Sequence, residues 1–190
     1  MYWKDEGYLL SKNNFDENSI IIETFTRDHG KYTGMVYGGS SRKQKRNFQA
    51  GNKILLNWKS KNENRTGYFN VELLQPVAPF FFDNKKKTVC ILSATSILKI
   101  LLPERQTNKI IYTSFEKMLS SLKLDNWIDI YINWELSLIK ELGYENIINN
   151  NTKNVKEALS YNRNLLIENF IMPNKLKFPL FRNILENYFS

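Results

Sequence analysis

The sequence predicts an α+β protein: an N-terminal five-stranded OB-fold β-barrel followed by a C-terminal all-helical domain. Two observations carry this prediction. Residues 1–80 hold short β-branched and aromatic runs between turn residues, whereas apolar residues beyond residue 84 recur at three- and four-residue steps. Pro76 and Pro79 lie where the pattern changes. We therefore assign residues 1–80 to the barrel and residues 81–190 to a helical bundle.

The first half contains five predicted strands, at residues 7–11, 19–26, 31–37, 53–59 and 68–74. Residues 19–26 are the strongest, because β-branched and aromatic side chains dominate them. Turns are expected at residues 27–30, where Gly30 suits a positive φ, and at residues 62–67. So short a sheet must hide its edges, which favours a closed barrel. Residues 40–50 leave room for the loop or short helix that an OB-fold has between its third and fourth strands.

The second half contains five predicted helices, at residues 88–102, 108–124, 125–142, 155–171 and 179–189. Pro103 ends the first of them, and Pro179 suits the start of the last. The helix at residues 125–142 is the clearest, because its large apolar residues share one face. These residues are Trp127, Ile130, Tyr131, Trp134, Leu138 and Leu142. Gly143 is suited to end it.

Positive charge is concentrated between residues 42 and 65. This segment has eight basic residues and the single acid Glu63, so it carries +7 of the formal net charge of +8. A concentrated positive surface favours a polyanion as partner, although a solvated loop that keeps the protein soluble is the plain alternative. The predicted phosphate contacts are Arg42, Lys43, Lys45, Arg46, Lys53, Lys59, Lys61 and Arg65.

Aromatic residues accompany this charge, and rings beside cations are typical of a groove for single-stranded nucleic acid. Trp58, Tyr68 and Phe69 are the candidates for stacking on bases. Strand alternation places Trp58 on the same face as Ile54 and Leu56, which favours its burial in the barrel. The helical half has a further group of lysines. They form either a second contact surface, which would bind DNA or an acidic protein tail, or only the solvated start of a helix. The members of this group are Lys85, Lys86, Lys87 and Lys99.

Catalytic, cofactor and metal motifs are not found, so we expect a protein that is not an enzyme. Gly38-Gly39 before a basic run lacks the second glycine of a phosphate loop. His29 is read as a solvated turn residue, Cys90 as a small core residue, and the acidic pair Asp5-Glu6 as surface residues. One cysteine and one histidine supply neither a disulfide nor a zinc site.

The hydropathy of the chain and its first residues also bear on where in the cell the protein is found. No stretch of eighteen apolar residues predicts a membrane span, and the first residues do not have the pattern of a signal peptide. We therefore expect a cytoplasmic protein.

The order of several short motifs resembles one family, the bacterial recombination mediator RecO. The opening strand WKDEGYLLS and the turn FTRDHGK are similar to that family, as are the glycine-then-basic segment YGGSSRK and the phrase FQAG that precedes the fourth strand. The helical half adds INWELSLIKELGY, which resembles the family's helix ending in LGY or LGF. Each motif is weak alone, but their order and spacing make the resemblance specific.

The resemblance implies an N-terminal OB-fold and a C-terminal helical domain. It implies binding of single- and double-stranded DNA, annealing of complementary strands and help in loading the recombinase RecA. Its implied partners are RecR and the acidic C-terminal tail of single-strand-binding protein. Many members insert a cysteine-bearing module, a zinc site in some, where this chain has ENIINNN at residues 145–151. Two other hypotheses stay open: a small RNA-binding OB-fold protein, and a protein-interaction adaptor that does not touch DNA.

Overall fold

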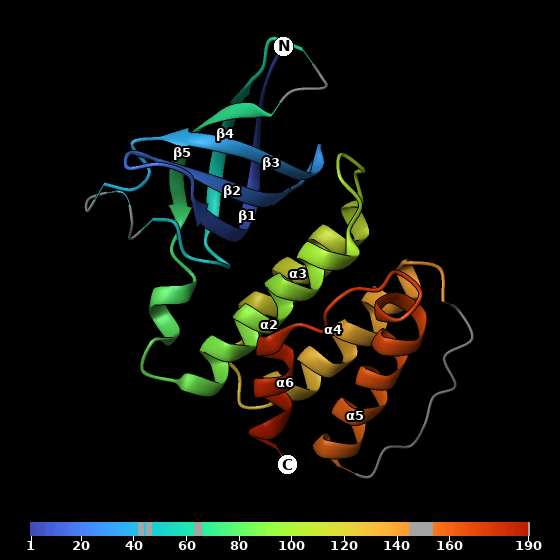
Figure 1. The fold of residues 1–190 in the computed structure, drawn as a ribbon. Helices are drawn as coiled ribbons and strands as arrows, with labels where there is room; N and C mark the ends of the chain where they lie inside the picture. The colour runs from blue at the N-terminus through green and yellow to red at the C-terminus, as the bar shows by residue number, and fades with distance from the viewer. Residues whose placement is uncertain (42–43, 45–46, 63–65, 145–153, 190) are drawn as a thin grey trace.

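The N-terminal half is a closed barrel of five strands (Figure 1). The computed structural model describes residues 1–41, 44, 47–62, 66–144 and 154–189. The strands are β1 (Tyr2–Asn14), β2 (Ser19–Thr26), β3 (Gly30–Tyr37), β4 (Lys53–Lys59) and β5 (Gly67–Gln75). They close in the order β1-β2-β3-β5-β4, and the pairing is antiparallel except between β3 and β5. The predicted OB-fold barrel and the helical half that follows it are confirmed.

Strand β1 is longer than the sequence predicts, because it serves two partners. Its first part, from Tyr2 to Tyr8, pairs with β4, and its second part, from Gly7 to Asn14, pairs with β2. An irregularity in the pairing with β2 lies between Leu9 and Ser11. The sequence did not predict this length, because polar residues near both ends of β1 interrupt the apolar pattern of a strand. The prediction for residues 40–50 falls partly outside the described residues.

The barrel interior is filled by the inward residues of the strands and by Phe48, which lies between β3 and β4. Its buried residues are Leu9, Ile20, Ile22, Val36, Phe48, Ile54, Leu56, Trp58 and Phe69. Two glycines make room for the large rings. A Cβ at Gly34 would lie 2.4 Å from the ring of Phe69, and one at Gly67 would lie 2.2 Å from the indole nitrogen of Trp58. Both contacts are far inside van der Waals distance, so the aromatic core of the barrel depends on these glycines.

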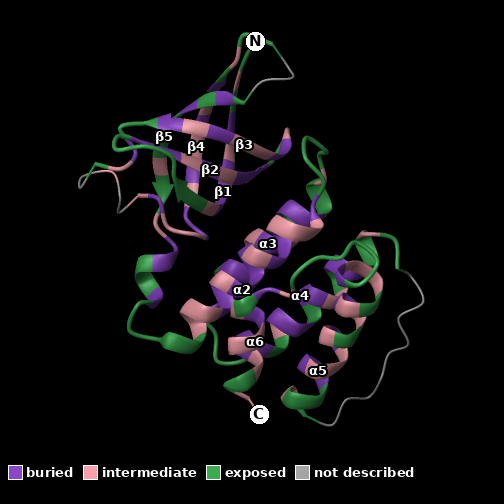
Figure 2. Ribbon diagram, viewed as in Figure 1, coloured by how far each residue is buried: buried purple, intermediate pink, exposed green. Residues whose placement is uncertain are grey.

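The C-terminal half is helical, and its buried residues face one another across the bundle (Figure 2). The elements are η1 (Ala78–Phe81), α2 (Lys85–Leu101), α3 (Lys109–Ser121), α4 (Trp127–Glu141), α5 (Val155–Leu166), η2 (Ile167–Ile171) and α6 (Leu180–Asn187). All five predicted helices are present, with ends shifted by a few residues. Asn84, Asn108 and Asn154 cap α2, α3 and α5 by accepting a backbone N–H. Cys90 is fully buried, as predicted.

The two halves are joined by polar contacts. The Tyr8 hydroxyl and the Lys53 amine both donate to Glu116 of α3, at 2.8 and 2.7 Å. The loop between α2 and α3 is fixed to the barrel as well, because the backbone N–H of Arg105 donates to the carbonyl of Lys31 at 2.8 Å. This loop rises beside β3 in Figure 1. The helical half therefore supplies residues to the rim of the barrel.

Gly30 is the tightest point of this junction, and it yields the first testable prediction. Its φ is +76°, and a Cβ there would lie 2.1 Å from the backbone oxygen of Gln106. We expect Gly30→Ala to lower the free energy of unfolding by about 3 kcal/mol, because backbone strain and a backbone clash add. Urea denaturation followed by tryptophan fluorescence measures this loss.

Gly38→Ala is the matched control. Gly38 has a φ of +70° but nothing within 4 Å of an added Cβ, so only the strain of about 1 kcal/mol is expected. Equal losses in the two variants would contradict the proposed role of the contact with Gln106.

Candidate nucleic-acid interface

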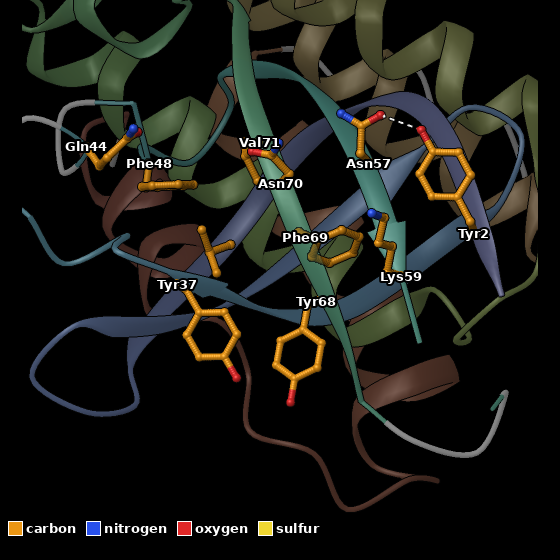
Figure 3. Close-up of a pocket in the computed structure, with 11 residues that line it drawn as sticks. Tyr2, Tyr37, Gln44, Phe48, Asn57, Lys59, Tyr68, Phe69, Asn70 and Val71 are labelled. Atoms are coloured by element: carbon orange, nitrogen blue, oxygen red, sulfur yellow. Dashed lines mark hydrogen bonds between the residues drawn. The ribbon is translucent and has the colours of Figure 1, made fainter. Parts of the chain in front are cut away.

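A shallow cavity of about 490 Å³ lies on the outer surface of the barrel (Figure 3). It is formed by the start of β1, the end of β3 and the facing parts of β4 and β5. The polar and exposed aromatic residues of its lining include Tyr2, Tyr37, Gln44, Lys59, Tyr68 and Asn70. Exposed rings and amine or amide groups thus share one hollow. We call this surface the tyrosine face.

Strand register explains why these side chains meet. Tyr2 pairs with Lys59, and Lys59 pairs with Tyr68, so three strands contribute one row across the barrel. All three residues are exposed. The next row is Trp3, Trp58 and Phe69, which point into the barrel because successive side chains alternate between faces. The same alternation therefore builds the aromatic core and the aromatic surface.

Tyr37 and Tyr68 form a stacked pair on this surface. Their ring centroids are 5.0 Å apart and the ring planes differ by 18°. The side chains extend together away from the barrel in Figure 3, and the residues are 65% and 45% exposed. The hydrogen bond with the Tyr68 hydroxyl raises the pKa of Tyr37 above its ordinary value. Adjacent exposed rings on a protein surface are typical of a binding surface.

Tyr2 is held in place at the other end of the tyrosine face. Its hydroxyl donates to Asn57 Oδ1 at 3.1 Å, the bond drawn in Figure 3. The amine of Lys59 lies 5.7 Å from the centroid of the Tyr2 ring. A fixed ring therefore lies beside a cation. This arrangement suits a nucleotide, because its base can stack on the ring while its phosphate contacts the cation.

Two of the predicted phosphate contacts lie at the tyrosine face. Lys59 and Lys61 line a hollow that continues past Tyr2 and Tyr68. Five others, Arg42, Lys43, Lys45, Arg46 and Arg65, lie outside the described residues. Gln44, which stands between Lys43 and Lys45 in the sequence, lines the cavity.

Lys53 lies elsewhere, on the side of the barrel that meets α3. Its amine pairs with Glu116 at 2.7 Å and with Glu6 at 3.3 Å. Burial opposes the charged form, but these two carboxylates outweigh it and raise the pKa of Lys53. Lys53 therefore stays charged while contacting protein carboxylates, and it does not line the tyrosine face. Its role as a phosphate contact stays a prediction.

The three candidates for base stacking are separated by burial. Trp58 and Phe69 are 3% and 4% exposed and belong to the barrel core, so of the three Tyr68 is exposed at the surface. Sequence reasoning missed Tyr2 and Tyr37. The alternation that buries Trp58 also turns Tyr37 outward after the buried Val36, and that signal was present in the sequence.

Three of the four helical lysines have contacts within the protein. Lys99 pairs with Glu23 at 2.7 Å. The amine of Lys86 lies 4.9 Å from the ring centroid of Phe189, and that of Lys87 lies 5.9 Å from the ring centroid of Phe81. These contacts favour neither a DNA nor a protein partner for this group.

His29 and Asp5 differ from the predictions of a solvated turn residue and a surface acid. The His29 ring stacks on Trp3 with a centroid distance of 4.2 Å, and its Nδ1 lies 2.8 Å from Asp5 Oδ2. Asp5 itself is 7% exposed. The turn between β2 and β3 folds back onto β1, and this tertiary contact buries Asp5 and partly buries His29.

Within the described ranges, no group of three or more His, Cys, Asp or Glu residues is placed to hold a metal ion. The helices of this same part of the chain include none that is long and apolar enough to cross a bilayer.

Comparison with known proteins returns one family for both halves. Residues 1–77 match the model of the recombination protein O N-terminal region, and residues 84–157 match that of the C-terminal region. Curated relatives named DNA repair protein RecO include those of Roseobacter denitrificans, 34% identical over 145 residues, and Wolbachia sp. subsp. Drosophila simulans, 31% identical over 147 residues. The matches cover 76% of this chain, and the chain spans 60% of the length of these relatives.

Proposed function

Because the chain belongs to the RecO family, we propose that it acts in DNA repair as a recombination mediator that is not an enzyme. In this proposal it binds single- and double-stranded DNA, anneals complementary strands and assists loading of the recombinase RecA. The observation that carries the proposal is the tyrosine face, where exposed rings and lysines share one surface of an OB-fold barrel.

Single-stranded DNA would lie along the row from Tyr37 and Tyr68 to Tyr2. Bases stack on the exposed rings, and Lys59 and Lys61 contact phosphates beside them. The basic residues at 42–46 and Arg65 extend the positive charge in this proposal. Stacking on rings is tolerant of sequence, because every base has a π-face, so binding without strong sequence preference is expected.

Annealing follows from the same surface without catalytic groups. Two complementary strands repel each other through their phosphates, and lysines that neutralise one strand lower that repulsion for the second. No nucleotide or metal is needed for this step. RecR and the acidic tail of single-strand-binding protein complete the proposal as protein partners in the cytoplasm.

A salt series tests the proposal. Fluorescence anisotropy with a labelled single strand measures the association constant K at each salt concentration. If about six phosphates are neutralised, log K should fall against the logarithm of the salt concentration with a slope of about −4. Lys59→Ala/Lys61→Ala should make that slope shallower by about 1.4, since each lost phosphate contact contributes about 0.7. Replacing Arg42, Lys43, Lys45 and Arg46 with alanine should flatten it further.

Lys140→Ala/Lys156→Ala is the matched control, because it removes the same charge from exposed positions on α4 and α5. Equal effects of the two double variants would show that only net charge matters. Absence of binding at low salt would favour the adaptor hypothesis. Stronger competition by RNA than by DNA of the same sequence would favour the RNA-binding hypothesis, since only RNA offers a 2′-hydroxyl.

A further inference from the structure

A second cavity of about 560 Å³ lies at the rim of the barrel, where the start of β1, the turn between β2 and β3 and the loop between α2 and α3 meet. Its lining includes the rings of Tyr2, Trp3, His29 and Tyr32 and the cationic side chain of Arg105. Tyr2 lines this cavity as well as the tyrosine face. The two hollows are therefore neighbours on one surface.

A stack of three rings leads from the barrel core to this cavity. Trp58 and Trp3 have centroids 5.5 Å apart with planes 16° from parallel, and Trp3 and His29 have centroids 4.2 Å apart with planes 11° from parallel. Exposure rises along the stack, from 3% for Trp58 to 32% for the side chain of His29. The stack thus ends in a ring that reaches the cavity, where another flat ring would continue it.

Asp5 fixes the orientation of that last ring. Its Oδ1 accepts the N–H of Glu6 and its Oδ2 accepts the N–H of Asp28, each at 2.8 Å. Because these donors require an acceptor carboxylate, His29 donates its Nδ1 proton to Asp5 Oδ2. In the neutral ring Nε2 then remains an acceptor on the opposite edge. The imidazole is held in one plane before any ligand arrives.

Arg105 brings a cation to the same cavity. Its guanidinium lies 5.3 Å from the centroid of the Tyr32 ring. Its φ is +59°, uncommon for a residue other than glycine, and its N–H is bonded to Lys31 of β3. A strained, anchored backbone thus carries a guanidinium to the edge of an aromatic hollow.

We propose that this cavity is a nucleotide site, in which an unpaired base continues the ring stack on His29 and its phosphate contacts Arg105. The inference rests on the proposed function, and it extends the path of the single strand past Tyr2. An aromatic hollow alone also suits a cationic ligand, but Arg105 would repel one. Because Tyr2 belongs to both hollows, the occupant is the next nucleotide of the strand that lies on the tyrosine face.

His29 provides a direct readout, because it is the single histidine of the chain. The full chain labelled with ¹⁵N would be titrated with an oligothymidylate of about twelve nucleotides, a length within the range of one OB-fold. We expect the imidazole ¹⁵N resonances to shift over the same concentrations at which anisotropy reports binding. A ring that no base contacts would keep its resonances.

Arg105→Gly tests the phosphate contact without backbone strain, because glycine suits the positive φ and retains the N–H bonded to Lys31, and thermal unfolding shows that the fold is kept. We expect an affinity about fivefold lower and a salt slope shallower by about 0.7. Lys175→Gly is the matched control, since Lys175 is also at a positive φ, +53°, and its loss removes the same charge. It should leave binding unchanged.

The outcomes separate the two proposals. If the wild type binds the oligonucleotide but the His29 resonances stay fixed and the two glycine variants bind alike, this site is wrong and the proposed function stands. If the wild type binds no oligonucleotide at low salt, the proposed function is wrong and this site falls with it.

Discussion

Arg182→Met is expected to destabilise the helical half by about 3–5 kcal/mol, the largest effect on stability that we predict from a single substitution. Arg182 of α6 is fully buried, and its Nε and Nη2 donate to Glu135 of α4 at 2.7 and 3.2 Å. Burial by itself would lower the pKa of Arg182, but the charge of Glu135 outweighs it and raises the pKa. Removal of the guanidinium leaves the Glu135 carboxylate buried without its cation.

The loss would extend beyond one pair, because the pair belongs to a network across four helices. Nη2 of Arg182 also donates to the carbonyl of Leu159 on α5 at 2.6 Å. The Tyr131 hydroxyl donates to Glu135 at 3.0 Å and lies 2.8 Å from the Ser93 hydroxyl of α2. Domains of this size are stable by about 5–15 kcal/mol, so the variant is expected to be partly unfolded at moderate urea concentrations.

Urea denaturation followed by circular dichroism measures this prediction. The double variant Glu135→Met/Arg182→Met is the control, because replacing both charges with apolar side chains of similar volume is often neutral. It should recover most of the stability. If the double variant is as unstable as the single one, packing of Arg182 rather than its charge holds the helices together.

Tyr37→Ala/Tyr68→Ala is expected to weaken binding of single-stranded DNA by at least about 30-fold, the largest functional effect that we predict. Each base stacked on an aromatic ring contributes about 1–3 kcal/mol, and the two rings also support each other through their stacked contact. Both side chains are exposed, so their truncation removes little from the barrel core. Anisotropy at fixed salt measures the affinity, and thermal unfolding shows that the fold is retained.

Two controls make this result specific. Tyr37→Phe/Tyr68→Phe keeps the rings and removes only the hydroxyls, so affinity should stay close to that of the wild type. Phe80→Ala removes a ring that is 69% exposed but does not line the tyrosine face. Wild-type affinity in the double alanine variant would exclude the tyrosine pair as a stacking platform, whereas the salt dependence would still report on Lys59 and Lys61.

The elements of the fold were predictable from the sequence because they depend on local patterns. Alternation predicted strands β2 to β5 and the burial of Trp58, and the three- and four-residue spacing predicted all five helices. The length of β1 was not predictable, because its polar ends are strand only through pairing with β2 and β4. The short 3₁₀ helix η1 was not predicted either, because it lies in the connection between the two halves, where neither the strand nor the helix pattern is present.

The site was predictable only in part. Concentrated charge predicted Lys59 and Lys61 as phosphate contacts, and the structure places both beside Tyr68, but their role stays a prediction. The same charge also suggested Lys53, whose contacts with Glu116 and Glu6 join residues distant in the sequence. Alternation turns Tyr37 outward, but no local pattern indicates that Tyr2 and Tyr37 share one surface, because that surface forms only when β1, β4, β5 and β3 are side by side.

The sequence by itself therefore determined the type and order of the strands and α-helices, the location of the charge and, for β2 to β5, the alternation of inward and outward residues. Only the tertiary structure decided which outward residues become neighbours, as Tyr2, Lys59 and Tyr68 do, and which charged groups neutralise each other, as Arg182 and Glu135 do. The physical reason is the range of the interactions. Backbone geometry fixes side-chain direction within two to four residues, whereas contacts between strands and between helices depend on register and packing across the whole chain.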